Sequence, residues 1–144
     1  MKTNLTVQAY IIKDNKVLLV HHKKHRLWLP PGGHIEENET TDDALKREVK
    51  EEINIDIEFL NKSDIPVVGS TIKNLATPFY VNLHDVGDHL HCGIYYLCRP
   101  KTNNIKLKTD EVDDFKWFSK DDLKQAPEDV RAIAEKALEL AKNI

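Results

Sequence analysis

The feature that most constrains this chain is a run of glutamates on a helix predicted at about residues 41 to 53. Leu45, Val49 and Ile53 recur at helical spacing. Because each helical residue advances about 100°, these three side chains form one apolar stripe. By the same geometry Glu52 falls within about 20° of Leu45. An acidic face that is merely solvated would lie opposite the stripe, so at least one carboxylate is aimed toward the protein.

Three glutamates, Glu48, Glu51 and Glu52, neighbour one another on this helix at positions i, i+3 and i+4. They should repel each other unless a cation joins them. Oxygen-only ligands favour magnesium, calcium or manganese, whereas a zinc site would more often draw on His or Cys. Mg2+ is therefore the first choice and Mn2+ a substitute. Since Mg2+ is typically completed by substrate phosphates, the pattern predicts a phosphate-processing site.

The helix has local signals at both ends, and an open loop precedes it. Thr40 with Asp43 three residues on resembles a capping box, and Asn54 can adopt the left-handed conformation that ends a helix. Before it, Pro30-Pro31 and Gly32-Gly33 interrupt regular structure and let the backbone come close to another group. The helix and this loop are expected to form the site together.

The remaining patterns predict a mixed α/β arrangement in which helices pack on a sheet. Two β-branched runs flank Asp14-Asn15, which suits a tight turn, and an amphipathic helix follows Pro127. The segment 61 to 77 is unpatterned, as binding loops often are. The predicted strands are residues 5 to 13, 16 to 22, 55 to 60, 78 to 84, 90 to 98 and 114 to 118.

Size and composition set the class of protein. A chain of 144 residues fits one domain, 1–144, with a single core. No apolar run could cross a bilayer and the start lacks a signal peptide, so we expect a cytoplasmic protein that does not bind membranes. Cys92 and Cys98 suit reduced, buried positions. The net charge of -3 argues against large nucleic acid as a partner, despite a basic run at residues 21 to 26.

Residues 33 to 55 resemble the Nudix box. The family pattern is Gly, five residues, Glu, seven residues, Arg-Glu, an aliphatic, any residue, Glu-Glu, any residue, Gly and an aliphatic. Only Asn54 departs, standing where the family has Gly, and this bears on the helix end rather than on a ligand. The positions that match are Gly33, Glu39, Arg47, Glu48, Val49, Glu51, Glu52 and Ile55.

The resemblance implies a Nudix-type α/β/α sandwich with a mixed β-sheet between helices. It also implies a pyrophosphohydrolase in which water attacks phosphorus and a divalent metal binds the diphosphate of a nucleoside triphosphate or another nucleoside diphosphate derivative. Glu48 and Glu52 would be the principal metal ligands, Glu51 a further one and the carbonyl of Gly32 a backbone ligand. Arg47, beside these carboxylates, would orient them.

Further residues are candidates for supporting roles. Likeness to the family makes Glu39 structural and places a later acid near the site, with Glu111 the first choice and Asp110 its rival. For a small nucleotide-like phosphate substrate, the candidate contacts are Gly33, His89, His91 and Arg26. His89 and His91 alternate along a strand, which fits either a substrate cleft or a solvent-facing surface.

Two other functions remain open from sequence alone. One is a non-catalytic module that binds a nucleotide or sugar nucleotide on the same fold. The other is a structural protein in which the carboxylates clamp a metal only to stabilise the fold. The long 61 to 77 segment and exposed strand edges also make a homodimer an expectation.

Overall fold

The computed structural model describes residues 1–144. Its strands are β1 (Thr3–Lys13), β2 (Lys16–His22), β3 (Leu27–Leu29), β4 (Gly32–His34), β5 (Ile57–Phe59), β6 (Tyr80–Asp85), β7 (Leu90–Pro100) and β8 (Val112–Phe118). Its helices are α1 (Thr41–Ile53), the short 3-10 helix η1 (Asp121–Gln125) and α2 (Glu128–Ala141). Neither α1 nor α2 has the length and apolar character needed to cross a lipid bilayer.

The chain opens with the predicted β-hairpin. Asp14 and Asn15 link β1 to β2 with positive φ angles of 51° and 59°. Two successive residues with positive φ give the turn whose twist matches that of paired strands, and Asp and Asn tolerate this conformation better than most residues. Ile12 of β1 then lies opposite Val17 of β2.

The sheet is mixed, as expected. β1 runs parallel to the late strand β7, from Thr3 opposite Leu90 to Ile11 opposite Cys98, and every other pairing is antiparallel. The order along the main path is β3-β2-β1-β7-β5, with β4 beside β1, β6 beside β7 and β8 beside β2. β1 therefore contacts both β7 and the short strand β4 that carries the glycine pair.

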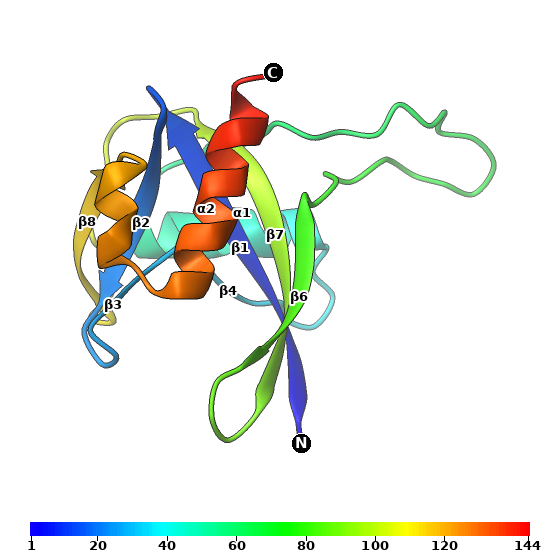
Figure 1. The fold of residues 1–144 in the computed structure, drawn as a ribbon. Helices are drawn as coiled ribbons and strands as arrows, with labels where there is room; N and C mark the ends of the chain where they lie inside the picture. Colours follow the sequence, from blue (N-terminus) through cyan, green and yellow to red (C-terminus); the bar gives the residue numbers. More distant parts are fainter.

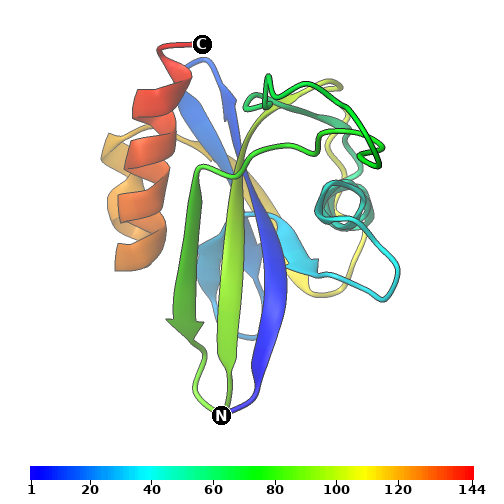
Figure 2. The same ribbon diagram turned by 90° about the vertical axis from the view of Figure 1, so that its right-hand side faces the viewer.

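The two helices lie on opposite sides of the sheet (Figure 1, Figure 2). The predicted stripe of Leu45, Val49 and Ile53 on α1 is fully buried, in a cluster with Val7, Ala9 and Ile11 of β1. Burying each such side chain contributes about 1.5 to 3 kcal/mol. A second cluster on the other face joins Tyr10 and Ile12 to the apolar stripe of α2, which includes Val130, Ile133, Ala134, Ala137 and Leu138.

Helix α1 begins and ends where its caps predict. The Thr40 hydroxyl accepts a hydrogen bond from the Asp43 N–H at 3.1 Å. Asn54 adopts the left-handed conformation with φ 66°, and its side chain donates to the Asn104 carbonyl at 3.1 Å. That extra bond gives an asparagine a use here that a glycine would not have.

Several predicted strand limits shift by a few residues. The strand expected at 55 to 60 is only Ile57–Phe59, because Ile55 is buried in the core beside α1 and the Asp56 N–H bonds the Thr102 hydroxyl instead of a strand. The strand expected at 114 to 118 begins two residues earlier, at Val112. The segment from 61 to 79 extends away from the body and has only one isolated bridge, Lys62 with Ala76 (Figure 1).

The two cysteines occupy different environments. Cys98 is fully buried, and burial raises the pKa of its thiol. Cys92 is only half-buried, so the expectation of a buried residue is wrong for it in part. Both thiols are free, as predicted.

Candidate active site

The site is built where α1 crosses the glycine pair of β4. A Cβ on Gly33 would lie 2.5 Å from Oε2 of Glu48, and one on Gly32 would collide with the carbonyl of Val7 in the neighbouring strand. Only glycine can therefore occupy either position without a shift of its neighbours. The missing side chain at Gly33 is what lets the Glu48 carboxylate lie directly on the strand.

Arg47 holds the acidic groups around this crossing. Its Nε donates to Glu39 Oε2 at 2.7 Å and Nη2 donates to Glu39 Oε1 at 3.0 Å, a bidentate pair. Nη1 donates to Glu48 Oε1 at 2.9 Å and to Glu51 Oε2 at 3.3 Å. Nη2 also donates to the His34 carbonyl at 3.0 Å. These contacts, led by the hydrogen bonds that Arg47 donates to Glu39, raise the pKa of Arg47.

Glu39 closes the loop between β4 and α1. Its Oε1 accepts a hydrogen bond from the Glu36 N–H at 2.9 Å while the same carboxylate receives the Arg47 fork. The hydrogen bond from Arg47 is the main reason that the pKa of Glu39 lies below its usual value. This position supports the geometry of the loop and lies one residue before the helix cap.

Glu52 is the unusual carboxylate of the group. Its residue is only 5% exposed, and its buried Oε1 has no hydrogen-bond partner. Burial, followed by the nearby charges of Glu48 and Glu111, raises the pKa of Glu52 to about 8, against a hydrogen bond from the Gly32 backbone that lowers it. An unpartnered buried carboxylate oxygen is costly, and it calls for a proton or a cation.

The two other glutamates lie progressively further out. Glu48 is partly buried, and burial raises its pKa in spite of the opposing hydrogen bond from Arg47. The Glu51 side chain is 57% exposed and touches Arg47 from the solvent side. Glu48, Glu51 and Glu52, which we call the box glutamates, thus form a gradient from solvent into the protein.

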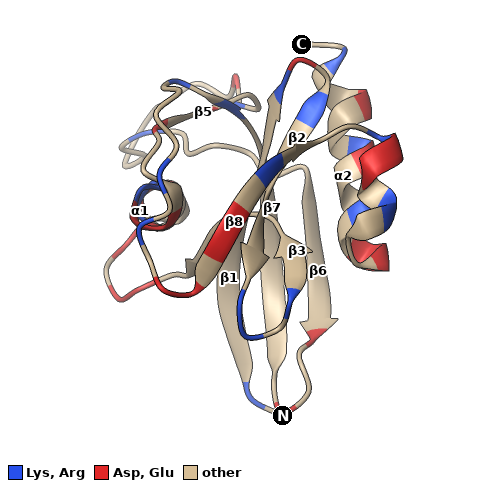
Figure 3. Cartoon of the chain, turned by 90° about the vertical axis from the view of Figure 1, so that its left-hand side faces the viewer, with Lys and Arg blue, Asp and Glu red and all other residues tan.

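Glu111 reaches the same region from the loop before β8. Its charge contributes to the raised pKa of Glu52, and its carbonyl accepts a hydrogen bond from the Lys23 N–H at 2.9 Å. Asp110 makes no such contribution to the pKa of Glu52. Figure 3 shows acidic residues along the loop before α1, on α1 and at the start of β8.

The donor set fits an oxygen-ligated cation, although it is no closed cage. No group of three or more His, Cys, Asp and Glu side chains is gathered tightly enough to hold a metal ion alone. Glu48 and Glu51 instead share the guanidinium of Arg47. Mg2+ needs only one or two carboxylates and takes its other ligands from water and phosphate. The unpartnered oxygen of Glu52 beside Gly32 and Glu48 meets that requirement.

The predicted substrate contacts are only partly brought together. The His91 ring lies 5.3 Å from the His34 ring and 4.9 Å from the His89 ring, centroid to centroid. Desolvation, followed by His34 and His89, lowers the pKa of His91. Arg26 lies in the turn between β2 and β3 with φ 54°, and no hydrogen bond or ion pair joins it to the box glutamates.

Sequence reasoning missed His34. Its carbonyl accepts a hydrogen bond from Arg47 while its ring packs edge-on against His91, so it links Arg47 with His91 of β7. The available signal was its place directly after Gly33. The second contact missed is that of Asp42, whose carboxylate accepts from the Ala76 N–H at 3.1 Å and ties the 61 to 79 segment to α1.

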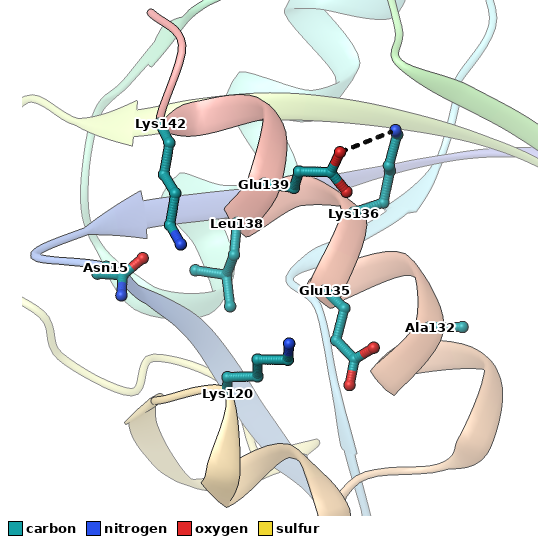
Figure 4. Close-up of a pocket in the computed structure, with 8 residues that line it drawn as sticks. All are labelled: Asn15, Lys120, Ala132, Glu135, Lys136, Leu138, Glu139 and Lys142. Carbon is teal, nitrogen blue, oxygen red and sulfur yellow. Dashed lines mark ion pairs between the residues drawn. The ribbon is translucent and has the colours of Figure 1, made fainter.

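A separate cavity of about 420 Å³ lies on the outer face of α2, between that helix, Asn15 and Lys120 (Figure 4). Lys136 and Glu139, which help to line it, pair with each other at 3.7 Å. It contains lysines and glutamates in mixture and none of the box glutamates. The geometry around Glu52, and not the size of this cavity, therefore locates the candidate site.

Comparisons with known proteins bear on the family and the fold of this chain. The family model described as the NUDIX domain matches residues 2–140. A solved NUDIX family hydrolase from Clostridium perfringens is 34% identical, with 98% of this chain and 99% of that chain covered and a TM-score of 0.86. The MutT NUDIX hydrolase from Burkholderia pseudomallei is 22% identical, covers 94% and 98% of the two chains and has a TM-score of 0.73, which supports the fold alone.

A curated relative is the 8-oxo-dGTP diphosphatase of Buchnera aphidicola subsp. Schizaphis graminum, which is 39% identical over 61 residues. That match spans 40% of this chain and 47% of the relative. The match to the domain model, by contrast, extends over almost all of the chain. The α/β fold, with a mixed sheet between two helices, is shared with the solved hydrolase. The chain therefore belongs to the Nudix family of hydrolases, enzymes that act on phosphoric anhydride bonds.

Proposed function

We propose that this protein is a Mg2+-dependent pyrophosphohydrolase that cleaves the diphosphate linkage of a nucleoside triphosphate or another nucleoside diphosphate derivative. The observation that carries the proposal is the unpartnered, buried Glu52 oxygen next to Gly32 and Glu48. Nudix hydrolases act on nucleotide-like substrates with divalent metals, and such a metal ion would be the partner of this oxygen. Mn2+ would substitute for Mg2+ because it accepts the same oxygen ligands.

Glu52 and Glu48 would hold the metal, with Glu51 and the Gly32 carbonyl as further ligands. When bound, the metal would neutralise phosphate charge and make a bound water more acidic. Arg47 would position Glu48 and Glu51, since its guanidinium already contacts both. Glu111, whose charge reaches Glu52, would accept a proton or contribute a further ligand.

Substrate contacts are proposed around the same crossing. Gly33 leaves room for a phosphate chain to approach the backbone beside Glu48. His89 and His91 would contact the part of the substrate that lies beyond the phosphates, and Arg26 the phosphates themselves. The Buchnera relative favours testing oxidised purine nucleoside triphosphates first. Residues 1–144 would act as one domain, in keeping with the two cores that share β1.

The test is a hydrolysis screen with Mg2+ that compares the wild type with Glu52→Gln. Substrates should include ordinary and oxidised nucleoside triphosphates, ADP-ribose, sugar nucleotides and dinucleoside polyphosphates. We expect Glu52→Gln to lower kcat by about 100-fold or more, because a neutral amide is a weak ligand for Mg2+ and cannot supply the charge of a carboxylate. Glu135→Gln, on the exposed face of α2, is the matched control. Equal turnover in both variants would refute the role of Glu52.

A further inference from the structure

Four of the seven histidines gather at one end of the sheet, on three different strands or their edges. His84 on β6 is the cross-strand neighbour of His91 on β7. His34, at the end of β4, packs its ring against His91, and His89 lies just before β7. Alternation along β7 puts His91 on the same face as Tyr95 and Leu97, which belong to the cluster under α2. The box glutamates, on α1, belong to the other side of the sheet.

Within this group a hydrogen bond joins the rings of His89 and His91. The two Nε2 atoms are 3.1 Å apart. Nδ1 of His89 lies 2.6 Å from Oδ1 of Asp88. A carboxylate can only accept, so the Nδ1–H of His89 donates to Asp88 and the neutral ring keeps its lone pair on Nε2. A carboxylate on the far nitrogen is the arrangement that orients histidines which ligate metals.

The distance between the two nitrogens matches that of one shared ion. Zn2+ binds imidazole nitrogen at about 2.0 to 2.1 Å, which in tetrahedral geometry places two such ligands about 3.3 Å apart. The observed 3.1 Å lies close to this value, so one ion can replace the hydrogen shared by the two rings when the His91 proton moves from Nε2 to Nδ1. Imidazole ligands suit zinc, copper and nickel, whereas the all-oxygen group on α1 suits Mg2+.

We propose that His89 and His91 form a two-histidine chelate for a divalent transition metal ion such as Zn2+, separate from the box glutamates. Water completes the coordination, because His34 and His84 are near but do not form a group of three ligands with this pair. Asp88 is a positioning residue that fixes the ring of His89. None of its ligands lies on α1, so ion binding here can be measured apart from the Mg2+ site. A bound ion would stand in for the direct substrate contacts proposed above for the two histidines.

The test measures Zn2+ binding to tag-free protein by calorimetry, in excess Mg2+ so that oxygen sites are filled. One ion should bind per chain. His89→Ala and His91→Ala should each weaken binding by at least about tenfold, and Asp88→Asn by about tenfold through loss of orientation. His25→Ala, in an exposed turn, and Glu52→Gln should bind as the wild type does. With Cu2+ as probe, the visible absorption band should show nitrogen ligation that disappears in His91→Ala.

Three results would overturn the proposal. Absence of binding in excess Mg2+ would mean that the 3.1 Å contact is only a hydrogen bond between imidazoles. Equal affinity in the wild type, His89→Ala and His91→Ala would place the ion elsewhere. Loss of binding in Glu52→Gln would place it at the box glutamates. Thermal unfolding of each variant, with His91→Gln as a milder second substitution, separates loss of a ligand from loss of the fold.

Discussion

At Glu52, stability and function favour different kinds of side chain. Its carboxylate is buried beside Glu48 and within reach of the charge of Glu111, with one oxygen unpartnered. A core designed only for stability would have an apolar residue here, because Glu52 borders the stripe of Leu45, Val49 and Ile53. The folded protein accepts the cost of burying this carboxyl group, whose raised pKa keeps it protonated near neutral pH in the absence of a cation.

This cost predicts a pH dependence of the metal-free protein. The folded pKa of Glu52 is about 8, above its ordinary value of 4.5, so the folded state binds the proton more tightly than the unfolded state does. The contribution of Glu52 is therefore fully favourable below about pH 4.5 and is lost as pH rises through 8, a change on the order of 3 kcal/mol by pH 7. With excess chelator, the difference in Tm between Glu52→Gln and the wild type should grow in favour of the variant from pH 5 to 8. Parallel curves would contradict the burial of a titrating carboxyl.

Gly33 predicts an effect on activity through a neighbour. A Cβ there would lie 2.5 Å from Oε2 of Glu48, so Gly33→Ala must displace that carboxylate. We expect kcat with Mg2+ to fall by about tenfold or more, since ligand geometry is sensitive to shifts of this size. Gly69→Ala is the control, because nothing lies within 4 Å of its Cβ and only the left-handed backbone, with φ 61°, is disfavoured. Full activity in Gly33→Ala would show that Glu48 needs no fixed position.

At the scale of elements, α1 is fixed to the loop before it by one guanidinium. Arg47→Lys keeps the charge but loses the fork that binds both oxygens of Glu39 and reaches Glu48, Glu51 and the His34 carbonyl. We expect the Mg2+ concentration at half-maximal rate to rise by several-fold and kcat to fall, because the carboxylates are no longer held. Lys46→Arg, the neighbouring position, is the control. An unchanged Mg2+ dependence would leave Arg47 with a purely structural role.

Elements whose signals are local could be predicted from sequence. The limits of α1 follow from Thr40, Asn54 and the apolar stripe, all within one stretch of chain. The helical spacing of the box glutamates likewise predicts that Glu52 borders the apolar stripe and points toward the protein. In contrast, β5 is shorter than expected because Asp56 is bonded by Thr102, 46 residues away. Contacts over such separations have no signature in a local pattern. For the same reason the sequence does not predict the contact of Asp42 with Ala76 or that of His34 with His91.

At the scale of the whole molecule, the site lies beside apolar cores whose stability comes from packing and not from the site. β1 supplies Val7 to the core under α1 and Tyr10 to the core under α2, with 16 and 14 buried residues respectively. The box glutamates lie at the edge of the first core, and neither core needs a metal to form. A metal should therefore stabilise the fold without being required for it. The oligomeric state stays a prediction, with the 61 to 79 segment and the edge strand β6 as the candidate contacts.

The response of unfolding to metal separates an enzyme's metal site from a metal clamp. If Mg2+ binds the folded state alone, a concentration about 100 times its Kd stabilises the protein by about 2.7 kcal/mol. For a chain of this size that raises Tm by several degrees, at about 3 °C per kcal/mol. The chelated wild type should still unfold cooperatively, because its two cores remain intact.

A non-hydrolysable nucleoside triphosphate should raise Tm further only with Mg2+ present, since its phosphates complete the coordination of the ion. Glu52→Gln should respond much less to Mg2+, whereas Glu135→Gln should match the wild type. A chain that fails to fold in chelator, or a nucleotide that adds nothing to the effect of Mg2+, would instead mean that the carboxylates only hold the structure together.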